Sequence, residues 1–128
     1  MLKLLSGIFI VLHGLVHLWY VVLSYGLVEF QPDMGWTGES WLLSGLLGES
    51  LARSLAGVLY IAATLAFVAG GVGIFADAEW WRPLVLGTAI LSSVLVLLYW
   101  DGGPEMIVQK GLVGLLINVG IIVLMLLK

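Results

Sequence analysis

The chain has 128 residues, of which 62% are hydrophobic and 10% are charged, with a formal net charge of −3 and no cysteine. A soluble domain carries about 25% charged residues, so this composition excludes an ordinary soluble domain and indicates a membrane protein. The lack of cysteine excludes disulfides, thiolate metal sites and iron–sulfur clusters. The acidic balance excludes the basic surface with which proteins bind nucleic acid.

Four long apolar runs, at about residues 4–28, 51–76, 84–100 and 111–127, are separated by three polar breaks. At a rise of about 1.5 Å per residue, each run is long enough to cross a bilayer core. Backbone groups in lipid need hydrogen-bond partners within the protein, so we expect all four runs to be helices. The sequence therefore predicts an all-α fold, a four-transmembrane-helix bundle in which residues 1–128 form a single membrane domain. The lipid bilayer is its expected partner, and the cell membrane, crossed several times, its expected location.

The first break, residues 29–50, contains a short apolar segment of its own. Ser40 is placed to cap a short helix over the sequence WLLSGLL, and Gly48 is placed to end it. This segment is too short to cross a membrane, so we expect an interfacial or re-entrant piece that lies over the mouth of the bundle. Trp36 and Trp41 are the candidates for a lid.

The basic residues favour one orientation of the bundle. The side that holds the N-terminus carries Lys3, Arg82 and Lys128, whereas the opposite side carries Arg53 and Lys110. Loops with more lysine and arginine stay in the cytoplasm, so both termini are expected to be cytoplasmic.

Polar residues in each run share one helix face when successive residues are turned by about 100°. On the first run this face holds Ser6, His13, His17, Tyr20 and Ser24. On the second run it holds Arg53, Gly57, Tyr60, Thr64 and Gly71. On the third run it holds Thr88, Ser92 and Tyr99, and in the fourth run Asn118 is the only strongly polar interior residue.

These polar groups lie at similar depths, so we expect them to face one another inside the bundle. Facing lipid they would lack partners, whereas inside the bundle they can satisfy one another. Serine and threonine hydroxyls can also bond their own backbone, and an asparagine can simply join two helices. A histidine pair on one face near mid-depth is a stronger sign of function. The candidate ligand-binding residues are therefore His13, His17, Tyr20, Tyr60, Thr64, Ser92 and Asn118.

Small residues of the second run indicate close helix packing. They recur three and four positions apart, which lets two helix backbones approach. The residues concerned are Ala62, Ala66, Ala69, Gly70 and Gly73.

Several ligand chemistries can be weighed against the histidine pair. A metal needs a third and a fourth ligand, and no run has cysteine, aspartate or glutamate near its centre, so no metal site is expected from a single chain. Haem with two histidine ligands would likewise need a dimer. A layer of histidine, tyrosine, serine and asparagine can hydrogen-bond a carbonyl or relay a proton, which favours a quinone or lipid over haem or metal. No carboxylate orients a histidine base, and no catalytic motif is present, so no catalytic residue is identified.

The sequence resembles small DoxX-like four-helix membrane proteins. The similar stretches are LHGLVHLWYVVLSYGL, SLARSLAGVLYIAATLAFVAGGVGIF, WWRPLVLGTAILSSVLVLLYWD and KGLVGLLINVGIIVLML, and the most specific element is HGLVH. Ser92, followed by Trp100 and Asp101, and Asn118 also match. The resemblance implies a four-helix bundle and a redox-associated or ligand-binding role, since DoxX relatives are linked to quinone-coupled oxidation. The longer acidic loop, PDMGWTGESW, departs from the pattern.

Three functions are compatible with these patterns. The first is binding of a small lipophilic or carbonyl-bearing ligand in a central polar pocket, which predicts a cavity that reaches His13 or His17. The second is a small proton-coupled transporter that works as a dimer. The third is a structural or accessory membrane subunit, which predicts a dry, tightly packed centre. In each case a bundle this small is expected to form a homo-oligomer.

Overall fold

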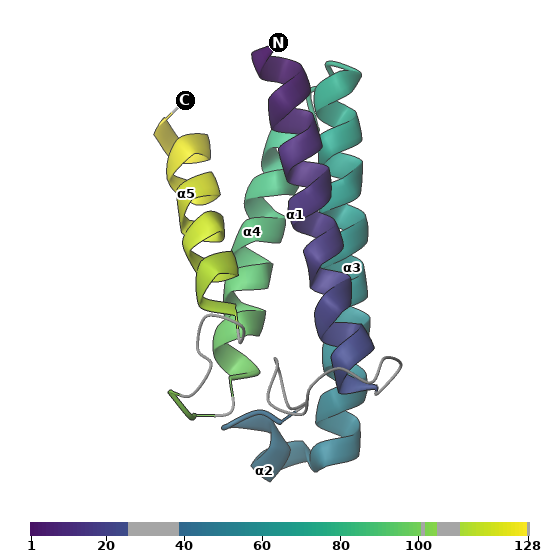
Figure 1. Cartoon of the computed structure of the whole chain (residues 1–128), viewed down its shortest axis with the longest axis vertical. Coiled ribbons are helices and arrows are strands. Elements are labelled where there is room, and N and C mark those ends of the chain that lie inside the picture. The colour runs from purple at the N-terminus through teal and green to yellow at the C-terminus, as the bar shows by residue number, and fades with distance from the viewer. Residues whose placement is uncertain (26–38, 101, 105–110, 128) are drawn as a thin grey trace.

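A computed structural model of the chain describes residues 1–25, 39–100, 102–104 and 111–127. All regular structure in this part is helical, which confirms the expected all-α fold for it. The helices are α1 (Leu2–Ser24), α2 (Leu43–Leu47), α3 (Glu49–Phe75), α4 (Trp81–Leu98) and α5 (Val113–Leu127). Figure 1 shows the four longer helices in an elongated bundle, with α2 at one end and both termini at the other.

Three helices are long and apolar enough to cross a membrane, namely α1, α3 and α4. Helix α5 is equally apolar but has only 15 residues, which corresponds to about 22 Å. A bilayer core is about 30 Å thick, so the described part of α5 is shorter than a full span. The structure therefore supports at least three crossings, and the fourth stays a prediction.

All four long helices begin two or three residues from the expected position: α1 begins at Leu2 and not at residue 4, and α3 begins at Glu49 and not at residue 51. Helix α4 begins at Trp81 and not at residue 84, because Pro83 stands in the first helical turn, where its missing N–H has no helical partner to lose. The regular part of α5 begins at Val113 and not at residue 111, because residues 111–112 form a π-helical turn in which Gly111 adopts a φ of 115°. The expected end of the first run, residues 26–28, lies outside the described residues.

The short helix α2 begins two residues later than the sequence predicts, with Leu42 and not Ser40 at its N-cap position, but Ser40 still bonds its first turn. The Ser40 hydroxyl accepts a hydrogen bond of 2.9 Å from the backbone N–H of Leu43, the first residue of α2. Gly48 ends the helix in a left-handed conformation with a φ of 84°. Helix α3 follows at once, so Gly48 serves as the hinge between the two helices.

Helices α1 and α3 pack against each other more extensively than any other pair in the described part of the chain. Glycine makes this approach possible: a Cβ atom added to Gly14 would lie 2.6 Å from the Cβ atom of Phe67. A Cβ atom on Gly71 would similarly lie 2.5 Å from a methyl carbon of Val11. Helix α3 also packs on α4, and α4 on α5, so α5 reaches the rest of the bundle mainly through α4.

Candidate functional site

Four polar side chains form a buried hydrogen-bonded group, called here the histidine layer: His13, His17, Ser92 and Asn118. His13 Nε2 lies 2.7 Å from Asn118 Oδ1, and the Asn118 amide nitrogen lies 2.8 Å from Ser92 Oγ. Ser92 Oγ in turn lies 2.5 Å from His17 Nε2. The layer therefore joins α1, α4 and α5 near the middle of the bundle.

The direction of each hydrogen bond follows from one fixed acceptor. The carbonyl oxygen of His13 can only accept, so His17 Nδ1, 3.0 Å away, carries the proton. His17 Nε2 then accepts from the Ser92 hydroxyl, whose oxygen accepts from the Asn118 amide. The side-chain oxygen of Asn118 accepts a hydrogen bond from His13 Nε2–H. The four bonds run in one direction and close a ring through the His13 main chain, with one proton on each imidazole.

The histidine layer is almost completely enclosed by the bundle. Ser92 and Asn118 are 0% exposed, and His13 and His17 are 6% and 4% exposed. The fully buried ring of Phe67 lies 5.0 Å from the His13 ring and 5.3 Å from the His17 ring, measured between centroids. The expected inward orientation of the pair is thus confirmed, and its partners come from three helices.

The remaining predicted residues lie around the layer in different ways. Tyr20 and Tyr60 are buried and stack on each other with ring centroids 5.0 Å apart, between the layer and the α2 end. Thr64 is buried as well, but its hydroxyl donates to the carbonyl of Tyr60 on its own helix, 2.9 Å away. The layer contains no hydrogen bond from Thr64, because the threonine hydroxyl is satisfied by the preceding turn.

Of the two tryptophans predicted to form a lid, the structure describes Trp41 but not Trp36. Trp41 is 59% exposed, and its indole N–H donates to the carbonyl of Leu97 at 2.8 Å. The backbone N–H of Trp41 also donates to the carbonyl of Trp100, 2.9 Å away. These two hydrogen bonds therefore hold Trp41 at the C-terminal end of α4. Trp36 lies outside the described residues.

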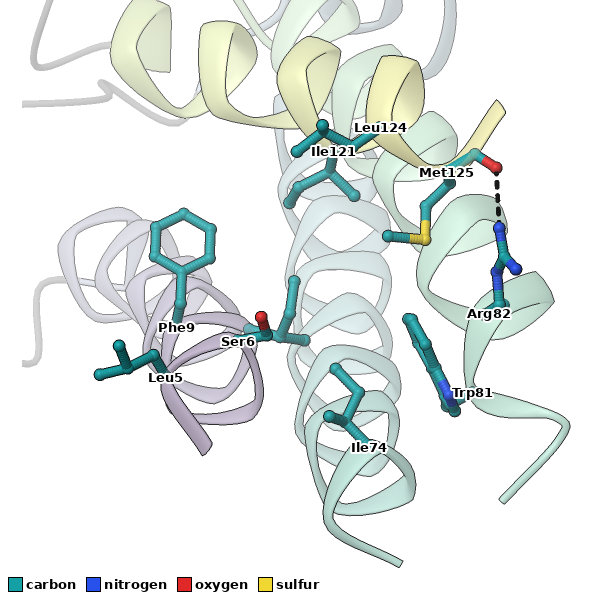
Figure 2. Close-up of a pocket in the computed structure, with 10 residues that line it drawn as sticks. Leu5, Ser6, Phe9, Ile74, Trp81, Arg82, Ile121, Leu124 and Met125 are labelled. Atoms are coloured by element: carbon teal, nitrogen blue, oxygen red, sulfur yellow. Dashed lines mark hydrogen bonds between the residues drawn. The ribbon is translucent and has the colours of Figure 1, made fainter. Parts of the chain in front are cut away.

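A cavity of about 440 Å³ opens between α1 and α5 at the end where the termini lie. All four long helices contribute to its wall, as Figure 2 shows. The apolar residues of the wall include Phe9, Ile10, Ile74, Trp81, Ile121 and Met125. Two polar residues, Ser6 and Arg82, also line it.

The cavity lies beside the histidine layer and does not include it. Neither His13 nor His17 belongs to the cavity wall. Ile10 precedes His13 by three residues and Ile121 follows Asn118 by three, so about 4.5 Å along the helix axis, a little less than one turn, separates the cavity from the layer. The expectation of a polar pocket around the histidine pair thus differs from the cavity found, whose inner wall is apolar.

Sequence reasoning did not identify Arg82 as a site residue. Its side chain is half-buried, and its Nη2 atom lies 3.4 Å from the carbonyl oxygen of Met125 near the end of α5. The sequence does contain two features that point to Arg82. It is an arginine at the start of an apolar run, and it directly follows the tryptophan pair Trp80 and Trp81. Ser6 was placed on the histidine face of α1, and the structure puts it on the cavity wall.

Comparisons with protein families, with curated proteins and with solved structures found no match. The resemblance to DoxX-like proteins therefore stays a prediction.

Proposed function

We propose that the chain is a multi-pass protein of the cell membrane that binds a small lipophilic ligand of the lipid or quinone type. In this proposal the chain crosses the membrane four times, with both termini in the cytoplasm, and the ligand occupies the cavity between α1 and α5. The bilayer itself would supply such a ligand, because the cavity opens between two helices on the outside of the bundle.

The observation that carries the proposal is the cavity of about 440 Å³ with apolar walls. Ligand sites in proteins have volumes of about 300–1,000 Å³, are mainly apolar and contain a few polar groups. Helices of a bundle commonly form such sites. Here Ser6 and Arg82 are the polar groups, and eight of the ten residues that line the cavity are apolar.

The histidine layer, which lies next to the cavity, holds together three of the helices that form the cavity wall. Its members bond one another, so the layer can fix the positions of α1, α4 and α5 and keep the cavity open at their ends. A buried polar network whose members are all satisfied specifies one arrangement of its helices. In this proposal the layer holds the helices around the ligand site in position, and the ligand binds beside the layer without contacting it.

The proposal is tested by the molecules that the protein retains on purification. The protein is extracted from membranes in a mild detergent, and its bound molecules are identified by native mass spectrometry and by analysis of an organic extract. Ser6→Phe places a ring in the cavity, whereas Ser54→Phe places the same ring on an exposed position of α3 outside it.

We expect the wild-type protein to retain a lipophilic molecule, Ser54→Phe to retain the same amount, and Ser6→Phe to retain about tenfold less. A wild-type protein with nothing bound, or equal retention by Ser6→Phe, would contradict the proposal and favour a structural subunit. The same spectra give the mass of the assembly, which checks the predicted homo-oligomer.

The continuous hydrogen-bond ring supports a second candidate, proton-coupled transport. The imidazole of His17 and the hydroxyl of Ser92, whose Nε2 and Oγ atoms lie 2.5 Å apart, are groups between which a proton can be exchanged. Proteoliposomes with a pH-sensitive dye inside test this candidate. Dissipation of an imposed proton gradient that His17→Ala abolishes would support it, and a stable gradient in the presence of lipophilic cations and quinones would contradict it.

A further inference from the structure

The cavity between α1 and α5 has an uneven distribution of polar groups, which bears on the class of its ligand. Its inner end is formed by Ile10 and Ile121, which offer no side-chain hydrogen bond. The cationic group, Arg82, lies in the first turn of α4, at the end of the bundle that holds the termini. A ligand that matches this distribution has an apolar tail inside and an anionic group at the rim.

Arg82 has hydrogen-bonding capacity that the described residues do not use. The ion pair found in the described part of the chain joins Lys3 to Asp77, and no described carboxylate lies within ion-pair distance of Arg82. The contact with the Met125 carbonyl, at 3.4 Å, is beyond the usual range of an N–H···O bond. A guanidinium carries five N–H donors, so a further acceptor can bind there.

The start of α4 also carries the tryptophans that are typical of the depth at which lipid head groups lie. Trp80, 52% exposed, and the half-buried Trp81 come immediately before Arg82. Tryptophan is enriched at the boundary between hydrocarbon and head groups, so Arg82 stands at about the depth of lipid phosphates when α4 crosses the membrane. Basic pockets between helices on the cytoplasmic side are sites at which anionic head groups bind.

We propose that the cavity takes an anionic phospholipid, with one acyl chain between α1 and α5 and the phosphate on Arg82. The inference rests on the proposed function and narrows its ligand from lipids and quinones to one class. A quinone that entered head first would place its carbonyl groups against isoleucine side chains, where no donor meets them. An anionic phosphate gains a charge-assisted hydrogen bond from the guanidinium, which a neutral ring does not.

The experiment is a lipid titration of the detergent-purified, delipidated protein, followed by native mass spectrometry. Phosphatidylglycerol and phosphatidylcholine with identical acyl chains are compared, and oleate is added in a third series. The variant Arg82→Gln removes the charge but keeps an amide donor for the Met125 carbonyl. Arg53→Gln is the matched control, because Arg53 is also a half-buried arginine near the start of a long helix, outside the cavity.

We expect the wild-type protein and Arg53→Gln to bind phosphatidylglycerol about tenfold more tightly than phosphatidylcholine, because the choline cation of the second lipid offsets the charge of its phosphate and repels the guanidinium. Arg82→Gln should bind both lipids equally, and Arg82→Lys should keep the preference because it keeps the charge. Ser6→Phe should weaken the binding of both lipids. Thermal melting of each variant in the same detergent shows that it is folded.

Three outcomes would overturn the inference. The preference for phosphatidylglycerol could persist in Arg82→Gln, or it could disappear equally in Arg53→Gln. Either result would mean that Arg82 does not cause the preference for the anionic lipid. Tighter binding of oleate than of phosphatidylglycerol would assign the site to a free fatty acid. In each of these cases weaker lipid binding by Ser6→Phe would leave the proposed function standing, whereas unchanged binding in Ser6→Phe would remove both.

Discussion

Asn118 on α5 and His13 on α1 are joined by a hydrogen bond of 2.7 Å, although these two helices do not pack along each other. The same Asn118 amide donates to Ser92 on α4, the helix against which α5 does pack. One fully buried asparagine therefore connects α5 to two helices at once, three residues before Ile121 of the cavity wall.

Asn118→Leu should destabilise the protein by about 2 kcal/mol, because it leaves His13 Nε2–H without its acceptor and Ser92 without its donor. The measurement is unfolding in detergent micelles titrated with sodium dodecyl sulfate, followed by tryptophan fluorescence. Val119→Ala, an exposed position one residue further on, should change the free energy of unfolding by less than about 0.5 kcal/mol. Equal changes in the two variants would mean that the layer does not hold α5 in place.

His17→Ala should lower lipid retention or the stability of the oligomer more than Val16→Ala does. His17 bonds Ser92 and the His13 carbonyl and is 4% exposed, whereas Val16 is 56% exposed on the outside of the bundle. Native mass spectrometry of both variants reports bound lipid and oligomer together. Small and equal effects in both readouts would remove the case for the histidine pair.

The two histidines should carry their protons on different nitrogens. The ring of hydrogen bonds requires Nδ1–H in His17 and Nε2–H in His13. Solid-state NMR of the protein in lipid bilayers, with ¹⁵N-labelled histidine, distinguishes the two tautomers by their nitrogen shifts. Finding both rings in the same tautomer would show that the ring of bonds does not close as described, whereas Ser92→Ala should leave the His17 proton on Nδ1, because the His13 carbonyl still accepts it.

Gly14→Ala should destabilise the protein by about 2 kcal/mol, because its new Cβ atom would lie 2.6 Å from the Cβ atom of Phe67 and 3.2 Å from the Thr64 carbonyl. Neither neighbour is the end of a flexible side chain, so the two helix backbones have to separate. Gly120→Ala meets no atom within 4 Å and should be neutral or stabilising, since alanine is the better helix former. The same detergent titration measures both variants, and matching results would argue against close packing at Gly14.

Much of the fold and part of the site can be predicted from the sequence because helical periodicity is local. The polar residues at intervals of three and four predict the buried faces correctly: His13 and His17 on α1, and Ser92 on α4, are all enclosed. The hydrogen bond at Ser40 is equally local, since it depends on a hydroxyl three residues before Leu43. These features need no knowledge of how the helices are arranged.

The partners of those residues depend on how the helices are arranged. Thr64 and Ser92 look alike in sequence, each a hydroxyl near mid-depth, yet Ser92 bonds His17 and Asn118 while Thr64 bonds its own helix. The small residues of the second run are confirmed in part: a Cβ atom on Gly70 or on Gly73 would lie within 3 Å of a side chain of α4. Ala62 is exposed, whereas Gly14 of the first run makes one of the close approaches between helices.

The amino-acid sequence by itself determined that the chain is helical and apolar, where the four long helices lie to within a few residues, and which face of each helix is polar. These properties follow from hydropathy, capping and a repeat of 3.6 residues, which act within one helix. Only the tertiary structure decided that the histidines are closed into a ring and that the cavity lies beside them with Arg82 at its rim. Both depend on the distances and angles between helices, which are set by close contacts between residues far apart in the chain.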